Sequence, residues 1–279
     1  MMRDILLGLS LTPGIGWQTI HKLILAGIDT HVFHFTVREW LKEYPFLSMK
    51  QVEGLTEWLV EDKLNEYKAN LAKRHIEYVT VVDSCYPPLL KEISFAPWIL
   101  FVKGNPALLS TPTLAVVGSR KATHYGRMAT EKLVTELVKA GWGITSGLAL
   151  GIDAIAHQAT ITAQGIGIGV LGCGIDQIYP AQNKHLYHNL AKQGLLVSEY
   201  PPGTKAHPGF FPQRNRIIAG LSYGVIVVEA AKKSGSLITA QIALEHGREV
   251  FAVPGSIFSQ QSVGTNLLIQ QQGAKLITH

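Results

Sequence analysis

From Leu114 onward, short apolar runs alternate with segments in which apolar residues recur at helical spacing. A short apolar run bounded by turn residues is typical of a buried strand, and a period of three to four residues is typical of a helix. The runs predicted as strands are residues 114–117, 143–146, 167–171, 195–198, 225–228, 249–252 and 275–277. The segments predicted as helices include residues 126–140, 151–164, 184–193 and 236–246. This alternation predicts an α/β fold with a doubly wound, mostly parallel sheet.

The first 70 residues have a different pattern, because their apolar residues recur at helical spacing throughout. The turn Thr12–Gly16, with the sequence TPGIG, separates two such segments and is similar to the turn of a helix–hairpin–helix. Between residues 75 and 102 the pattern changes to short strand-like runs. We therefore predict a small all-helical domain, SAM- or helix–hairpin–helix-like, over residues 1–70 and a second domain over residues 71–279.

Charge is distributed unevenly between these two parts of the chain. The formal net charge is +5, but residues 1–70 carry 7 Lys and Arg against 9 Asp and Glu, a net of −2. Residues 71–279 carry 18 against 11, a net of +7. A basic excess confined to the glycine-rich α/β part favours an anionic partner such as a nucleic acid there. The acidic balance of the helical part argues against strong DNA binding by its Thr12–Gly16 turn.

The sequence also bears on the compartment. Asp4 and neighbouring polar residues interrupt the start of the chain, which differs from a secretory signal peptide. No apolar run approaches the ~20 residues needed to cross a bilayer. The two cysteines, Cys85 and Cys173, stand alone, which favours reduced thiols over a disulfide. We expect a cytoplasmic protein that has no membrane partner.

Loops rich in Gly, Ser and Arg follow several predicted strands. Gly118-Ser119-Arg120 follows the first strand, and Ser234-Gly235-Ser236 follows the fifth. Arg214-Asn215-Arg216 lies before the fifth strand and is expected to open a helix. In a parallel sheet the loops at the carboxyl edge converge, and backbone N–H groups, helix N-termini and guanidinium groups there bind phosphate. The predicted phosphate-binding residues are Gly118, Ser119, Arg120, Gly147, Lys184, Arg214, Asn215, Arg216, Ser234, Gly235 and Ser236.

These motifs also have purely structural interpretations. A glycine after the first strand is common in doubly wound folds, and neither GxGxxG nor GxxxxGK[ST] is present. Arg120 favours the functional interpretation, because a guanidinium at this edge is costly to desolvate unless an anion pairs with it. Arg214-Asn215-Arg216 taken alone is also typical of a charged surface turn. Glu229, at the end of the fifth strand, is expected to form a structural salt bridge with an arginine.

Asp153 and His157 stand four residues apart on a predicted helix, after Gly147 and Gly151 of the loop that follows the strand predicted at residues 143–146. Acid–base chemistry and a simple intrahelical hydrogen bond are alternative interpretations of this pair. No further His or Cys at ligand spacing joins them, so we expect no metal site. Phe210 and Phe211 either stack on bases or form a hydrophobic plug in the loop before Arg214.

One ordered set of motifs carries a resemblance to a known family. The set comprises GSR at 118–120, SGLALGID at 146–153, YP at 179–180, SEYP at 198–201, FPQRNR at 211–216, SGSLITA at 234–240, VPG at 253–255 and GTN at 264–266. In this combination and order the motifs resemble the DNA-processing protein A (DprA/Smf) family, from about residue 75 to the end. The resemblance implies an extended Rossmann-like domain preceded by a small helical domain.

The resemblance further implies a bacterial protein of natural transformation (competence) and DNA recombination. Such proteins bind incoming single-stranded DNA, relieve the block imposed by single-strand-binding protein and load the RecA recombinase. They act as homodimers through the Rossmann-like domain, with no catalysis and no cofactor. Phosphate contacts would then fall to Ser119, Arg120, Lys184, Arg214, Arg216 and the 234–236 loop. The dimer surface is expected near Ile257-Phe258 and residues 267–269, although this apolar strip equally suits a buried core helix.

A nucleotide-processing enzyme on a related Rossmann-like scaffold is the alternative. Phosphoribohydrolases of this kind carry a PGGxGTxxE signature whose carboxylate assists cleavage. The corresponding stretch here, residues 234–239, lacks both the glycine run and the Glu. Asp153, Glu199 and Glu229 are the carboxylates that keep this alternative open.

Overall fold

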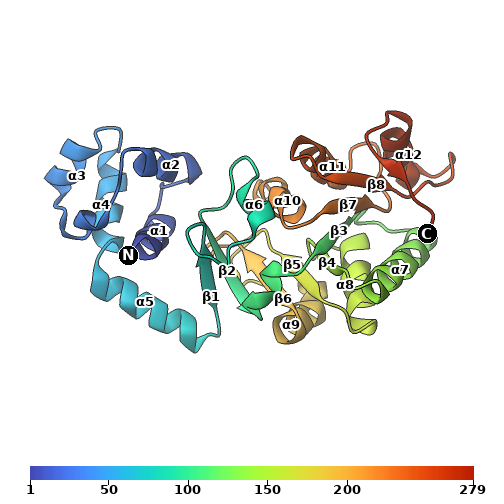
Figure 1. The fold of residues 1–279 in the computed structure, drawn as a ribbon, viewed down its shortest axis with the longest axis horizontal. Helices are drawn as coiled ribbons and strands as arrows, with labels where there is room; N and C mark the ends of the chain where they lie inside the picture. The colour runs from blue at the N-terminus through green and yellow to red at the C-terminus, as the bar shows by residue number, and fades with distance from the viewer.

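The computed structural model describes residues 1–279 and joins an N-terminal group of helices to a nine-stranded sheet (Figure 1). The N-terminal elements are α1 (Met2–Leu11), α2 (Trp17–Leu25), η1 (Thr30–His34), α3 (Val37–Glu43), α4 (Met49–Trp58) and α5 (Glu61–Lys73). Thr36 and Ser48 begin α3 and α4 with capping boxes, which satisfy the first N–H groups of both helices. The helices close around the fully buried Trp40 and a shell of leucine, isoleucine and valine side chains.

The sheet has the strand order β1-β2-β6-β5-β4-β3-β7-β8-β9. Its strands are β1 (Glu77–Thr80), β2 (Ile99–Gly104), β3 (Thr113–Val117), β4 (Gly143–Ser146), β5 (Gly167–Val170), β6 (Leu195–Ser198), β7 (Gly224–Val227), β8 (Glu249–Ala252) and β9 (Lys275–Leu276). Neighbours pair in parallel from β6 through β9, whereas β2 is antiparallel to both β1 and β6. The mostly parallel α/β fold predicted from the alternating pattern is confirmed.

Helices cover both faces of this sheet. They are α6 (Pro88–Lys91), α7 (His124–Lys139), α8 (Ile152–Thr162), α9 (Lys184–Gln193), α10 (Phe210–Gly220), α11 (Gly235–Glu245) and α12 (Val263–Gln270), with short turns η2 (Pro106–Ser110), η3 (Ala181–Asn183) and η4 (Gln260–Ser262). Ala115 and Val117 of β3 share a core cluster with α10 and α11, and Val116 between them packs with α7 and α8. Because side chains alternate across a strand, a strand covered on both faces is apolar throughout. None of the helices has the length and apolar character to span a membrane.

Strand order reverses between β3 and β7. The chain proceeds from β3 through β4 and β5 to β6 on one side, then crosses to β7 and continues to β8 and β9 on the other. The loops after β3 and β7 therefore diverge and leave a crevice at the carboxyl edge of the sheet. Ligands of open α/β sheets bind at such a reversal.

The prediction that Arg214-Asn215-Arg216 opens a helix is wrong by one turn. Helix α10 begins at Phe210, with Gly209 at its N-cap. Pro212 is accommodated because it lies in the first turn, where its missing N–H would have no intrahelical acceptor. Phe210 and Phe211 therefore belong to the helix and not to the preceding loop.

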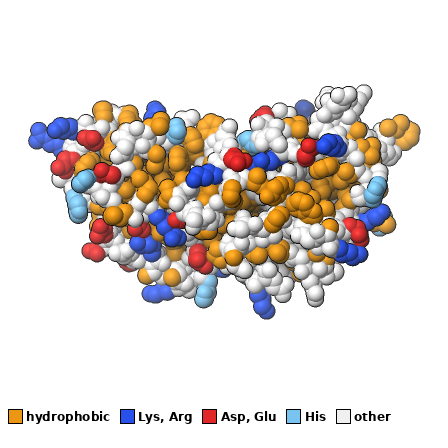
Figure 2. All heavy atoms as spheres, in the orientation of Figure 1, with side chains coloured by type: hydrophobic (Ala, Val, Ile, Leu, Met, Phe, Trp, Pro, Cys, Tyr) orange, Lys and Arg blue, Asp and Glu red, His pale blue; other side chains and the backbone are white.

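The helical part packs directly against the edge of the sheet. Leu7 of α1 and Leu64 and Leu71 of α5 lie in the same buried cluster as Tyr78 of β1 and Phe101 of β2. In the view of Figure 2, hydrophobic side chains are spread along the length of the molecule, over both the helical part and the sheet part. Residues of α2 and of α10 line one cleft beside this junction, and α10 also lines the crevice at the carboxyl edge of the sheet.

Candidate nucleic-acid interface

A cleft of about 660 Å³ opens at the carboxyl ends of β3 and β7, and we call it the β3–β7 cleft. The loop after β3, the first turns of α10 and α11, and the loop around Tyr179 form its walls. Of the predicted residues, those lining it are Gly118, Ser119, Arg120, Arg214, Asn215, Ser234, Gly235 and Ser236. The structure thus brings together three segments that are far apart in the sequence.

Three exposed cations line the β3–β7 cleft: Arg120, Lys121 and Lys233. None of them takes part in an ion pair. Asp153, the one acidic residue of the lining, is 6% exposed. Unneutralised positive charge in a concave site attracts anions. Lys121 and Lys233 were missed at the sequence level, although each directly flanks a predicted motif.

An aromatic pair lies beside these cations. Tyr179, which is 50% exposed, stacks on Phe211 with ring centroids 5.3 Å apart and an interplanar angle of 29°. The Cζ atom of Arg120 lies 5.8 Å from the centroid of the Phe211 ring. Stacked rings next to a guanidinium can hold a base and its phosphate together. Phe210 stacks instead on Tyr200, at 4.3 Å.

The N-terminus of α11 completes the cleft. Ser234 is its N-cap, and the Ser234 Oγ accepts a hydrogen bond from the Ser236 N–H at 3.4 Å. Gly235 is exposed, and a Cβ atom there would meet nothing within 4 Å, so its backbone is open to a ligand. Asn215 donates from Nδ2 to the Gly235 carbonyl at 3.5 Å, which links α10 to α11. The positive end of the α11 dipole thus faces the same space as the three cations.

Ser119 shapes the loop after β3. Its Oγ donates to Gln261 Oε1 at 2.6 Å and accepts the Lys121 N–H at 3.0 Å. The single hydroxyl proton of Ser119 is therefore used within the protein and is not available to a phosphate. Its side chain holds the loop that carries Arg120 and Lys121.

Arg214 forms part of the cleft floor and is 4% exposed. Its Nη1 donates to the carbonyl of Gly147 at 2.6 Å and also to the carbonyl of Val170. Asp153 accepts the N–H groups of Gly147 at 3.2 Å and Ala149 at 3.4 Å. Both backbone polar groups of Gly147 are thus held. A Cβ at Gly147 would lie 2.5–2.6 Å from the guanidinium, so only glycine admits Arg214 here.

The intrahelical hydrogen bond considered for Asp153 and His157 is absent, because the Asp153 carboxylate turns to the Gly147–Ala149 backbone. Burial raises the pKa of Asp153, which the positive charge of Arg214 partly opposes. His157 is fully buried, and neither ring nitrogen has a hydrogen-bond partner. Burial lowers the pKa of His157 to about 4. His157 is therefore a neutral core residue at pH 7.

Three further residues lie away from the cleft lining. Lys184 is exposed at the start of α9. Arg216 lies on the other side of α10, where both of its terminal nitrogens pair with Glu199. The expected salt bridge from Glu229 to an arginine is wrong: Glu229 accepts the Thr123 N–H at 2.9 Å and the Thr123 hydroxyl at 2.5 Å, and so holds the start of α7. No cluster of three or more His, Cys, Asp or Glu side chains has the arrangement of a metal site.

The chain is a Rossmann-like α/β protein with a cleft lined by unpaired cations at the reversal of strand order. The chain matches the family described as DNA recombination-mediator protein A over residues 77–279. It is 48% identical over 216 residues to the DNA processing protein DprA of Bacillus subtilis, covering 77% of this chain and 72% of that one. It is also 48% identical over 216 residues to the DprA of Streptococcus pneumoniae, covering 75% and 74%. The chain belongs to the DprA/Smf family, as the motifs indicated.

Two solved structures agree with this membership. The X-ray structure of Streptococcus pneumoniae DprA superposes with a TM-score of 0.73 at 40% identity, covering 95% of this chain and 95% of that one. The structure of Helicobacter pylori DprA superposes with a TM-score of 0.67 at 33% identity, covering 74% and 93%. The Helicobacter pylori structure is described as giving insight into that protein's single-stranded DNA binding mode. A role in DNA processing follows from the family.

Proposed function

We propose that this protein is a single-stranded DNA-binding recombination mediator and that the β3–β7 cleft is its DNA site. The observation that carries the proposal is the conjunction of three unpaired cations with the Tyr179–Phe211 stack in one cleft. Phosphates bind to Arg120, Lys121, Lys233 and the α11 N-terminus, and a base stacks on the exposed Tyr179 ring. This mode is sequence-tolerant, because phosphates and ring faces are common to all nucleotides.

The finer role follows the family. The protein would accept incoming single strands during natural transformation in the cytoplasm, displace single-strand-binding protein and load RecA. It would act as a homodimer through the Rossmann-like domain, with residues 1–70 as a separate helical domain. Ile257 and Phe258 are 82% and 91% exposed, which supports a dimer surface there. Lys184 would contact the strand outside the cleft, because it is exposed on α9 shortly after Tyr179.

We further propose that the role is not catalytic. Of the three carboxylates that a phosphoribohydrolase could use, Glu229 holds Thr123 and Glu199 pairs with Arg216. Asp153 lines the cleft, but both of its backbone partners would have to be released before it could assist cleavage. Turnover of a nucleoside monophosphate that Asp153→Asn abolishes would instead support the enzyme.

Fluorescence anisotropy of labelled oligonucleotides tests the binding proposal. We expect the protein to bind single strands more tightly than the matching duplex, without nucleotide or metal. The logarithm of its affinity should fall linearly with the logarithm of salt concentration, since bound cations are released from the phosphates. Absence of binding at low salt would refute the proposal. RecA filament formation on DNA coated with single-strand-binding protein then tests the mediator role.

A further inference from the structure

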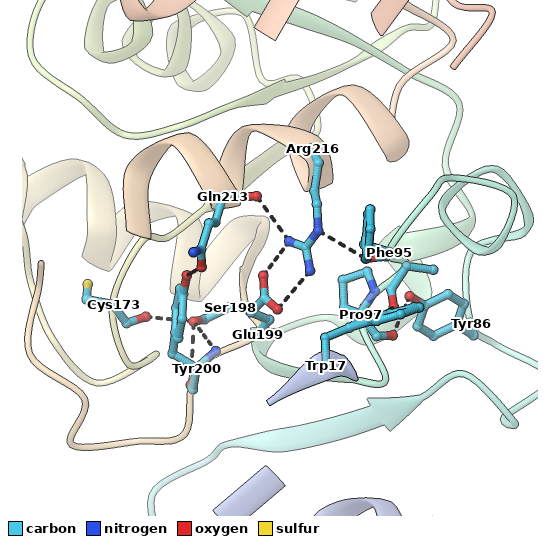
Figure 3. Close-up of polar contacts among 11 residues, drawn as sticks. Trp17, Tyr86, Phe95, Pro97, Cys173, Ser198, Glu199, Tyr200, Gln213 and Arg216 are labelled. Carbon is cyan, nitrogen blue, oxygen red and sulfur yellow. Dashed lines mark hydrogen bonds and ion pairs between the residues drawn. The ribbon is translucent and has the colours of Figure 1, made fainter. Parts of the chain in front are cut away.

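A second cleft, of about 680 Å³, lies between the helical part and the sheet. It is lined by α2, the turn 95–98 and the side of α10 that carries Gln213 and Arg216. Figure 3 shows Arg216 and Gln213 extending from α10 toward Glu199 and Tyr200, with Trp17 and Phe95 close by. We call it the α2–α10 cleft. None of the functions proposed above uses it.

Aromatic rings dominate the lining of the α2–α10 cleft. Trp17, Phe95, Trp98 and Tyr200 all contribute to it. The Trp17 ring stacks on Trp98 at 5.4 Å and meets Phe95 edge-on at 4.8 Å. The Trp17 Nε1 donates to the Ala96 carbonyl at 2.7 Å, which fixes its ring to the turn. The cleft therefore offers flat, preordered surfaces of the kind on which a planar heterocycle stacks.

The cleft carries no free charge. Its only charged residues are Arg216 and Glu199, and the Arg216 Nη2 donates to Glu199 Oε1 at 2.9 Å. The Arg216 Nε donates to the Phe95 carbonyl at 3.0 Å, and Nη1 donates to the Gln213 carbonyl at 3.0 Å. Four of its five N–H donors are used inside the protein and Glu199 neutralises its charge, so this guanidinium is poorly suited to bind a phosphate. The contrast with the three unpaired cations of the β3–β7 cleft favours an uncharged occupant.

Residues that line the α2–α10 cleft carry polar groups without partners. No side chain caps α2, and its first paired N–H is that of Ile20, so the N–H groups of Trp17, Gln18 and Thr19 have no acceptor. The Gln213 Oε1 accepts a hydrogen bond from the Tyr200 hydroxyl at 3.2 Å, and its Nε2 donors remain unpaired. These donors suit the carbonyl and ring-nitrogen acceptors on the edge of a nucleobase.

Phe95 adopts a backbone conformation that is unusual for its residue type. Its φ is 58°, and its side chain is 53% exposed. A bulky residue in the left-handed region is strained, and such strain persists only where surrounding contacts enforce it. The Phe95 carbonyl accepts the Arg216 Nε hydrogen bond, and the Phe95 ring contacts Trp17 at the edge of the cleft.

Helix α10 separates the two clefts. Phe211, Asn215 and neighbouring residues line the β3–β7 cleft, whereas Gln213 and Arg216 line the α2–α10 cleft. A helix with its side chains is about 10–12 Å across, a distance that a few nucleotides of extended strand can cover. We propose that a single strand held by its phosphates in the β3–β7 cleft passes over α10 and inserts a base into the α2–α10 cleft. This inference rests on the proposed single-stranded DNA binding.

Replacing Phe95 by glycine tests the inference. Glycine adopts a positive φ without strain, so Phe95→Gly removes the ring and leaves the fold intact. The matched control is Phe46→Gly, because Phe46 is 44% exposed and lines neither cleft. Affinity is measured for oligothymidylates from about 4 to about 16 nucleotides long. Intrinsic tryptophan fluorescence is recorded alongside, since Trp17 and Trp98 line the α2–α10 cleft.

We expect the unchanged protein to bind longer oligonucleotides more tightly and to show quenching only with them. Phe95→Gly should bind the long oligonucleotides about tenfold more weakly, the scale of removing one base stack, and bind the shortest ones normally. Its salt dependence should not change, because every phosphate keeps its partner. If the unchanged protein and Phe95→Gly bind oligonucleotides of every length with equal affinity, the proposed base site in the α2–α10 cleft is overturned, but the proposed function is not. Failure of the unchanged protein to bind any single strand would overturn the proposed function as well.

Discussion

Arg120 and Arg214 are predicted to fail in different ways when each is replaced by alanine. Arg214 is 4% exposed and holds the carbonyls of Gly147 and Val170. Its loss leaves these acceptors unpaired and removes the positive charge beside the buried Asp153. Removing one partner of a buried charged network costs about 3–5 kcal/mol, so Arg214→Ala should lower the free energy of unfolding by this amount.

Arg120→Ala should leave stability within about 0.5 kcal/mol of the unchanged protein, because the side chain is exposed and makes no ion pair. It should instead weaken single-stranded DNA binding by about 1–3 kcal/mol, the scale for one charge-assisted hydrogen bond. The slope of log affinity against log salt should become shallower by about 0.7 for each phosphate of the single strand that the variant no longer neutralises.

The assay pairs urea unfolding, followed by circular dichroism, with anisotropy titrations over a salt series. Arg127→Ala is the matched control, since Arg127 is an exposed arginine of α7 that lies outside the cleft. A stable Arg214→Ala variant with a reduced salt slope would refute the structural role assigned to Arg214. It would restore Arg214 as a phosphate-binding residue, which is what the motif alone indicated.

Three further predictions follow from buried or exposed groups. Burial lowers the pKa of His157 from 6.5 to about 4, so its contribution to stability is complete above pH 6.5 and is lost as the pH falls through 4. That contribution is about 3 kcal/mol. Between pH 7 and pH 4, the free energy of unfolding measured in urea should therefore fall less in His157→Leu than in the unchanged protein. A methyl group on Gly126 would overlap the Glu229 carboxylate, so Gly126→Ala should lower the free energy of unfolding by about 1–3 kcal/mol; an unchanged melting temperature would contradict this. Phe258→Asp should convert the proposed homodimer to a monomer in light scattering, and a persisting dimer would exclude this surface.

The sheet was predictable because parallel strands covered on both faces are apolar without interruption, as in Val225–Val228. The roles of Arg214 and Arg216 could not be predicted, because they depend on which residue begins helix α10 and therefore on the side of the helix to which each arginine points. Arg214 and Arg216 are two residues apart, and on a helix such positions lie on nearly opposite sides. Once α10 begins at Phe210, Arg214 turns into the cleft floor and Arg216 turns toward Glu199. Pro212 was the available signal that the helix begins before Arg214, because proline is tolerated in the first turn of a helix and not in its interior.

The hydrogen bond between the Ser119 and Gln261 side chains can form only late in folding. It joins residues 142 positions apart, and the bond from Thr123 to Glu229 spans 106. Closing such long loops is slow relative to forming local helices, because the chain must give up entropy before these bonds form. During refolding, secondary structure should therefore return before the ability to bind single-stranded DNA. Within the cell, the nascent chain would remain unable to hold a DNA strand until the segment containing Gln261 has been synthesised.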